Sequence, residues 1–70
     1  MRKGGGFLYK RLIAERKERG LVQKDVAKML DLGFYTYRRR EIGEIDFKLS
    51  ECKKLSEMFE VPIEDLFKQF

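Results

Sequence analysis

The stretch from residue 22 to residue 41 reads VQKDVAKMLDLGFYTYRRRE, and it decides which fold to expect. In its first half, apolar residues recur at the spacing of one helical face, at Val22, Val26, Ala27 and Leu30. Residues 31–33 then interrupt the pattern with Asp, Leu and Gly. A second short segment follows over residues 34–41, with Tyr37 facing inward. The pattern therefore predicts two short helices joined by a turn of about three residues, the size of a helix-turn-helix unit.

The flanking sequence extends this helical pattern in both directions. Before the unit, apolar residues at helical spacing predict a helix that ends at Gly20, and its apolar positions are Leu8, Leu12 and Ile13. After a loop at residues 44–47, a fourth helix is expected with Leu49, Cys52, Leu55, Ser56 and Phe59 on one face. Pro62 suits the first turn of a fifth helix lined by Ile63, Leu66 and Phe67. No segment alternates with period two, so the expected fold class is all-α.

The length and composition fit one small domain. The chain has 70 residues, of which we assign 7–70 to a single folded domain and 1–6 to a flexible basic arm containing Gly4, Gly5 and Gly6. No long apolar run predicts a membrane span or a secretory leader. A single cysteine excludes an internal disulfide, and Cys52 is expected to be a small buried apolar residue. These features favour a cytoplasmic protein.

The charge is unevenly distributed along the chain. Residues 1–40 carry twelve Lys or Arg and four acidic residues, whereas residues 41–70 carry four Lys and eight acidic residues. The first part therefore has a net charge of +8 and the second of −4. This asymmetry has two explanations that composition alone does not separate. One side of the protein faces a polyanion while the other turns away from it, or a chain in which 40% of the residues are charged is patchy by chance.

The residue inventory argues against an enzyme. The chain has no histidine and one cysteine. Its Gly-rich start lacks the strand and spacing of a phosphate-binding loop, and its carboxylates do not follow the spacing of a calcium loop. We therefore expect no catalytic residue, no metal and no cofactor.

An ordered set of residues between Leu12 and Phe67 resembles the Cro and phage-repressor helix-turn-helix family. The matching positions are Arg16, Gly20, Leu21, Gln23, Val26, Ala27, Leu30, Thr36, Glu41, Gly43, Leu55, Val61 and residues 63–67. The resemblance implies a compact five-helix domain like that of lambda repressor. It also implies a transcriptional regulator, most often a repressor of phage or mobile-element type, that binds double-stranded DNA.

The resemblance implies specific roles for the two-helix unit. The helix at residues 34–41 is expected to enter the major groove, and the helix before it to cross the DNA backbone. Gln23 and Lys24 would contact phosphates at a helix start. The recognition residues would be Phe34, Tyr35, Thr36, Arg38 and Arg39. Arginine suits this role because its planar fork of donors fits a guanine edge or two phosphate oxygens.

Further expectations concern the scaffold and the assembly. The resemblance implies an ion pair between Arg16 and Glu41 that orients the recognition helix. It also implies a homodimer, at least on DNA, that binds a palindromic operator. The candidate contact residues for that dimer are Phe67 and Phe70.

The sequence departs from the family pattern at several places, which keeps a second function open. Val22 and Gly33 stand where the family often has a Ser or Thr cap. Phe34 and Tyr35 replace polar readers, and Glu44 and Asp46 make an often basic loop acidic. The alternative is a protein-interaction module on the same scaffold, antirepressor-like or antitoxin-like, with Phe34 and Tyr35 as its binding patch.

Overall fold

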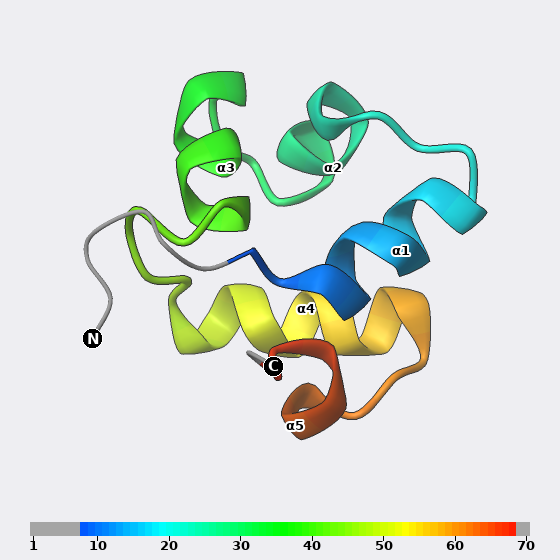
Figure 1. Ribbon diagram of the computed structural model, residues 1–70. Helices are drawn as coiled ribbons and strands as arrows, with labels where there is room; N and C mark the ends of the chain where they lie inside the picture. Colours follow the sequence, from blue (N-terminus) through cyan, green and yellow to red (C-terminus); the bar gives the residue numbers. More distant parts are fainter. Residues whose placement is uncertain (1–7, 69–70) are drawn as a thin grey trace.

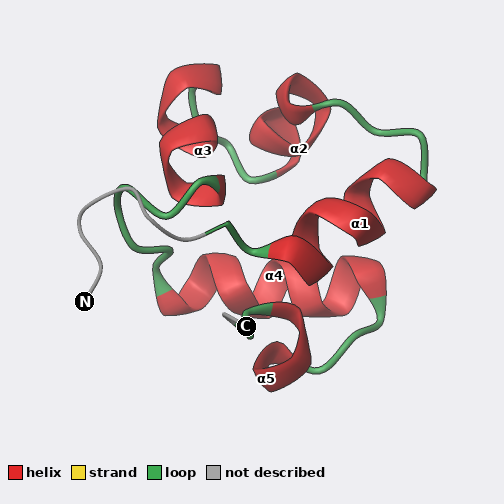
Figure 2. Cartoon of the chain, in the orientation of Figure 1, coloured by secondary structure: helices red, strands yellow, loops and turns green. Residues whose placement is uncertain are grey.

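Five α-helices follow one another along residues 8–68, the part of the chain that this computed structural model describes (Figures 1 and 2). They are α1 (Lys10–Glu18), α2 (Gln23–Met29), α3 (Phe34–Glu41), α4 (Leu49–Phe59) and α5 (Ile63–Leu66). No strand occurs within these residues, so the predicted all-α class is confirmed. The basic segment 1–6 and Phe70 lie outside the described residues.

The helices enclose one apolar core. In Figure 1, α2 and α3 lie at one end of the molecule, α4 and α5 at the other, and α1 between them. Every helix contributes at least one buried residue to the core. The buried apolar residues are Tyr9, Leu12, Val26, Ala27, Leu30, Tyr37, Leu55, Phe59, Val61 and Leu66.

Aromatic rings join α3 to the two ends of the chain. The Phe47 ring, in the loop before α4, lies with its centroid 5.8 Å from Tyr9, 6.1 Å from Tyr37 and 5.2 Å from Phe67. Phe67 also meets Tyr9 edge to face at 5.4 Å. Such edge-to-face contacts add stability beyond the area that the rings bury. They fix the inner side of α3, so its outer side is held in a defined position.

The first three helices end in the same way. Each is followed by a residue in the left-handed conformation: Gly20 (φ 70°), Asp31 (φ 60°) and Gly43 (φ 84°). After α2, the N–H of Asp31 donates to the carbonyl of Lys28, and that of Leu32 to the carbonyl of Ala27. This paired pattern is the Schellman motif, which satisfies the last carbonyls of a helix and turns the chain sharply. Asp31 fills the position that glycine usually takes, so sequence inspection did not mark the end of α2 as clearly as that of α1.

Several apolar residues are placed differently from the sequence prediction. Val22 is not on the buried stripe of α2; it precedes the helix and is 59% exposed. Leu49, expected on the inner face of the fourth helix, is 67% exposed because it begins α4 at the surface. Leu8 lies before α1 and is half exposed, while buried Tyr9 takes the inward position. Pro62 directly precedes α5 instead of opening it.

Cys52 is half buried on α4, so the expectation of full burial was too strong. Burial nevertheless raises the pKa of its thiol, and the neighbouring Glu51 carboxylate raises it further. The thiol therefore stays protonated at neutral pH and is a weak nucleophile. None of the helices between residues 8 and 68 combines the length and apolar character needed to cross a membrane.

Candidate nucleic-acid interface

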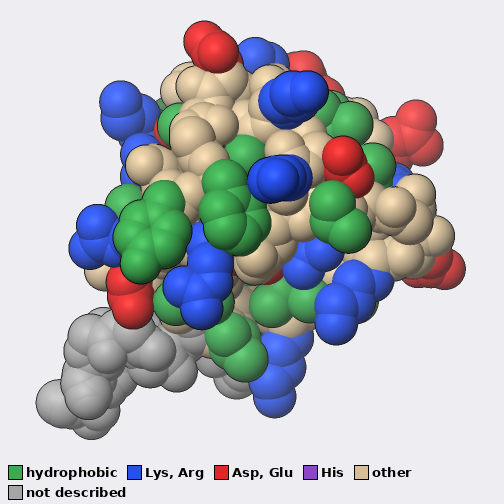
Figure 3. Space-filling model, turned by 90° about the horizontal axis from the view of Figure 1, so that it is seen from above, with side chains coloured by type: hydrophobic (Ala, Val, Ile, Leu, Met, Phe, Trp, Pro, Cys, Tyr) green, Lys and Arg blue, Asp and Glu red, His purple; other side chains and the backbone are tan. Residues whose placement is uncertain are grey.

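The outer side of the α2–α3 unit presents basic and aromatic side chains together. Tyr35 is 70% exposed, Phe34 is 42% exposed, and Arg38 and Arg39 are also exposed. Figure 3 looks onto this end of the molecule, where Lys and Arg side chains lie among exposed hydrophobic ones, with isolated carboxylates between them. Thr36, the remaining predicted recognition residue, is half buried. The arrangement combines positive charge with rings that can contact bases.

A buried carboxylate, that of Glu41, holds this surface to the rest of the domain. Arg16 donates to it twice, from Nε to Oε2 at 2.8 Å and from Nη2 to Oε1 at 3.2 Å. Its Nη1 donates to the carbonyl of Leu21 at 2.9 Å. The two side chains of the ion pair are 8% and 1% exposed. Arg16 and Glu41, which the sequence analysis paired, thus connect α1 to the last residue of α3 in a bidentate arrangement.

Two further side chains complete the hydrogen bonding of Glu41. Gln23 donates from Nε2 to Oε1 at 2.6 Å, and the Tyr37 hydroxyl donates to Oε2 at 2.6 Å. One carboxylate thereby joins α1, α2 and α3. Burial raises the pKa of Tyr37 well above its ordinary value, and the adjacent Glu41 carboxylate raises it further. The phenol therefore remains a donor over the whole physiological range.

This position of Gln23 adds to the role expected from the sequence. Its amide is half buried and bound to Glu41, so it helps to align α2 with α3. A primary amide has a second N–H on the same nitrogen, which leaves a donor for a phosphate oxygen. The sequence pattern predicts Tyr37 only as an inward-facing residue and not as a polar partner of Glu41, although it lies four residues before Glu41 and hence on the same helical face.

The three consecutive arginines of α3 have different surroundings. Arg38 is exposed and forms no ion pair within residues 8–68. Arg39 donates from Nε to Glu44 Oε1 at 3.1 Å. Arg40 turns inward, where its Nε lies 3.3 Å from Glu51 Oε1 and its Nη1 donates to the carbonyl of Asp46. A carboxylate therefore offsets the positive charge of Arg39 and of Arg40, and of the three arginines only Arg38 forms no ion pair within residues 8–68.

The start of α2 lies beside a shallow hollow. Lys24, Lys28 and Phe34 are among the residues that line this hollow of about 340 Å³ between α2 and the start of α3. Both lysines are exposed. The Asp25 carboxylate accepts the Val22 N–H at 2.9 Å, which satisfies one amide before the first turn. Positive charge at this edge thus comes from Lys24 and Lys28. The Asp25 carboxylate partly offsets the partial positive charge at the N-terminus of α2.

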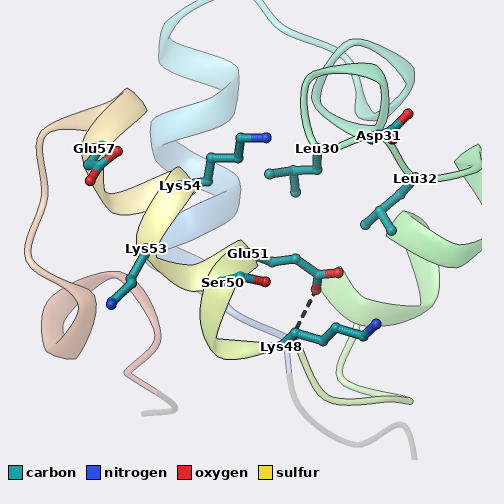
Figure 4. A pocket seen from close by; sticks show the side chains of 9 residues that line it. All are labelled: Leu30, Asp31, Leu32, Lys48, Ser50, Glu51, Lys53, Lys54 and Glu57. Carbon is teal, nitrogen blue, oxygen red and sulfur yellow. Dashed lines mark hydrogen bonds between the residues drawn. The ribbon is translucent and has the colours of Figure 1, made fainter.

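Lysines also gather on another side, but there they are mixed with acids. A pocket of about 470 Å³ between α4 and the end of α2 has three lysines and three carboxylates in its lining (Figure 4). The charged members are Asp31, Lys48, Glu51, Lys53, Lys54 and Glu57. Balanced charge of this kind attracts a polyanion weakly.

Of the residues proposed for dimer contact, the structure describes only Phe67. Its ring packs against Tyr9 and Phe47 within the chain and is half buried. Much of its apolar surface is therefore already used inside the monomer.

A two-helix unit with a basic, aromatic outer side on a five-helix scaffold defines a DNA-binding domain of the helix-turn-helix class. In agreement, the family described as helix-turn-helix matches residues 12–66. The chain belongs to this family, the Cro and repressor type, as the sequence resemblance predicted. No curated protein and no solved structure matches the chain.

Proposed function

We propose that this protein is a sequence-specific transcriptional regulator, a repressor of phage or mobile-element type, that places α3 in the DNA major groove. The observation that carries this proposal is the contrast between the two sides of α3. Its inner side is fixed by Tyr37 and Glu41, whereas Tyr35, Arg38 and Arg39 are exposed outside. A rigid helix with a basic, aromatic outer side is suited to reading base edges.

The residues of the unit divide into two groups in this proposal. Gln23 and Lys24, at the start of α2, contact phosphates and set the position of the domain. Phe34, Tyr35, Thr36, Arg38 and Arg39 face the groove. The aromatic rings can contact thymine methyl groups, and the arginines guanine edges. Thr36 is half buried, so its contact would be made by the edge of its side chain.

We further propose that two copies bind a palindromic operator. A recognition helix of 8 residues makes few base contacts, and two half-sites about one helical turn apart multiply its selectivity. Since Phe67 packs largely within the chain, a dimer contact at this end would use only its remaining exposed surface.

The proposal is tested by binding the protein to random-sequence duplex DNA at several salt concentrations. Phosphate neutralisation predicts a linear fall of log K with log salt, with a slope of about −0.9 for each phosphate contact. Selection from a random library should then recover a palindromic site that binds two chains in sedimentation. A binding constant that does not change with salt, together with no enriched sequence, would contradict the proposal.

Exposed aromatic residues favour a second candidate function, a protein-interaction module. Phe34 and Tyr35 lie at the start of α3, and Met29 at the end of α2 is also exposed, at 44%. Such residues are typical of protein contacts. This antirepressor-like or antitoxin-like reading gains support if the DNA experiments fail while Tyr35→Ala abolishes binding to a partner protein.

A further inference from the structure

The chain leaves α3 through a turn that places Glu44 beside Arg39. Gly43 is in the left-handed conformation at φ 84°. Its N–H donates to the carbonyl of Arg40 at 3.1 Å, and the N–H of Glu44 donates to the carbonyl of Arg39 at 2.9 Å. This Schellman motif characteristically brings the side chains of these two positions, here 39 and 44, into contact. The backbone conformation of this turn, as well as the opposite charges, therefore brings the Glu44 and Arg39 side chains into contact.

The pair that occupies these positions in α3 is ionic, whereas such contacts are usually apolar. After α2 the corresponding residues are Leu32 and Ala27, both apolar. In α3 the Arg39 Nε lies 3.1 Å from Glu44 Oε1, with 48% and 43% of the two side chains exposed. The ion pair therefore lies on the outer side of the unit, where Arg39 is proposed to read a base.

Glu44 engages only one of the nitrogen atoms of Arg39. The guanidinium has five N–H groups, and Nε supplies one of them. The two terminal nitrogens, Nη1 and Nη2, remain available as an end-on fork. Such a fork can donate to the O6 and N7 atoms of guanine. Holding Nε restricts rotation of the side chain and so reduces the entropy lost when the fork binds.

We propose that Glu44 is a positioning residue that gives Arg39 its preference for a base over a phosphate. This inference rests on the proposed function and adds a specificity determinant outside the recognition helix. The carboxylate orients the fork toward the groove floor. The negative charge of Glu44 also repels a phosphate oxygen that approaches Arg39. A guanine edge offsets this repulsion by accepting two hydrogen bonds from the fork, whereas a phosphate on random DNA makes no such specific contact. Nonspecific binding is thereby weakened more than binding to the operator.

The test compares wild type with Glu44→Ala on two duplexes. One is the highest-affinity sequence that wild type selects from a random library, and the other is a random-sequence duplex of the same length. We expect Glu44→Ala to bind the random duplex about two- to fivefold more tightly, the range that an exposed ion pair allows. The salt slope on that duplex should steepen by up to about 0.9, because Arg39 then neutralises a phosphate. Affinity for the selected duplex should not improve, so the specificity ratio falls.

Two further variants separate positioning from general electrostatics. Asp46→Asn removes a negative charge from the same loop, and its side chain is exposed. It should leave the specificity ratio near the wild-type value. In an Arg39→Ala background, Glu44→Ala should no longer change the ratio.

An unchanged or increased ratio in Glu44→Ala would overturn the inference. So would an equal fall in Asp46→Asn, or a fall that persists without Arg39. If wild type binds neither duplex with a salt-dependent affinity, the proposed function itself fails, and that result is distinct from the others.

Discussion

The Glu41 carboxylate accepts hydrogen bonds from Arg16, Gln23 and Tyr37, and its removal would leave the Arg16 guanidinium buried without a counter-charge. Breaking a buried pair by removing one partner typically costs about 3–5 kcal/mol. Since a domain of this size is only marginally stable, we expect Glu41→Ala to lower the urea unfolding midpoint severely.

Glu57→Ala is the matched control for this experiment. Glu57 is an exposed carboxylate on α4, so its loss should change the free energy of unfolding by about 0.5 kcal/mol or less. A Glu41→Ala midpoint as close to wild type as that of the control would mean that the network contributes no net stability.

The environment of Glu41 also shows how far the sequence alone could define the site. Arg16 and Glu41 were paired because their positions resemble those of a known family. Gln23 was assigned to phosphate only, because nothing in its local sequence reveals that Glu41, eighteen positions later, lies within 2.6 Å. The ion pair between Arg39 and Glu44 depends on the left-handed turn at Gly43 that ends α3, and the spacing of the two residues in the sequence does not specify that geometry.

The helices themselves were easier to predict than their ends. Apolar spacing located the helices because most of their inward positions are truly buried. Val22 is misplaced because periodicity extends the apolar stripe of α2 past the true helix start. Leu49 is misplaced because it is the first residue of α4, where the helix begins at the surface. Val22 precedes α2 in an extended conformation, and its side chain makes no capping hydrogen bond.

This geometry predicts that Val22→Ser stabilises the domain. Serine at this position can accept a hydrogen bond from a first-turn N–H, and such caps contribute about 1 kcal/mol. Little packing is lost, because Val22 is 59% exposed. We therefore expect a higher urea midpoint, with the same dependence of the unfolding free energy on urea.

Met29→Ser serves as the control for Val22→Ser. It makes the same apolar-to-serine change at a partly exposed residue of the same helix, away from the cap. Serine has a lower helix propensity there, so the midpoint should fall. If both variants shift the midpoint in the same direction, capping is not the cause.

In the folded molecule, the unpaired positive charge occupies a smaller region than the distribution of charge along the sequence indicates. The basic excess of residues 1–40 suggested a broad polyanion-binding side, but several of these charges are compensated in the fold. Arg11 and Arg19 both pair with Glu15, and Arg40 lies beside Glu51. Within the described α2–α3 unit, the exposed cations that form no ion pair are Lys24, Lys28 and Arg38. The effective basic surface is thus smaller than the sequence indicated, and it coincides with the proposed DNA-binding side.

This distribution predicts that lysines on different sides of the molecule will differ in their effect on DNA binding. Lys24 lies at the start of α2, whereas Lys54 lies on α4 among the mixed charges of the larger pocket (Figure 4). Lys24→Ala should weaken binding to selected and random duplexes alike and lower the magnitude of the salt slope by about one. Lys54→Ala, which lowers the net charge by the same amount as Lys24→Ala, should leave the salt slopes on both duplexes unchanged. Arg39→Ala should weaken the binding free energy by about 1–3 kcal/mol on the selected duplex and by much less on random DNA. If Lys24→Ala and Lys54→Ala lose equal DNA affinity, binding depends on the net charge of the protein rather than on the α2–α3 surface. The assignment of α3 to the major groove would then have to be abandoned.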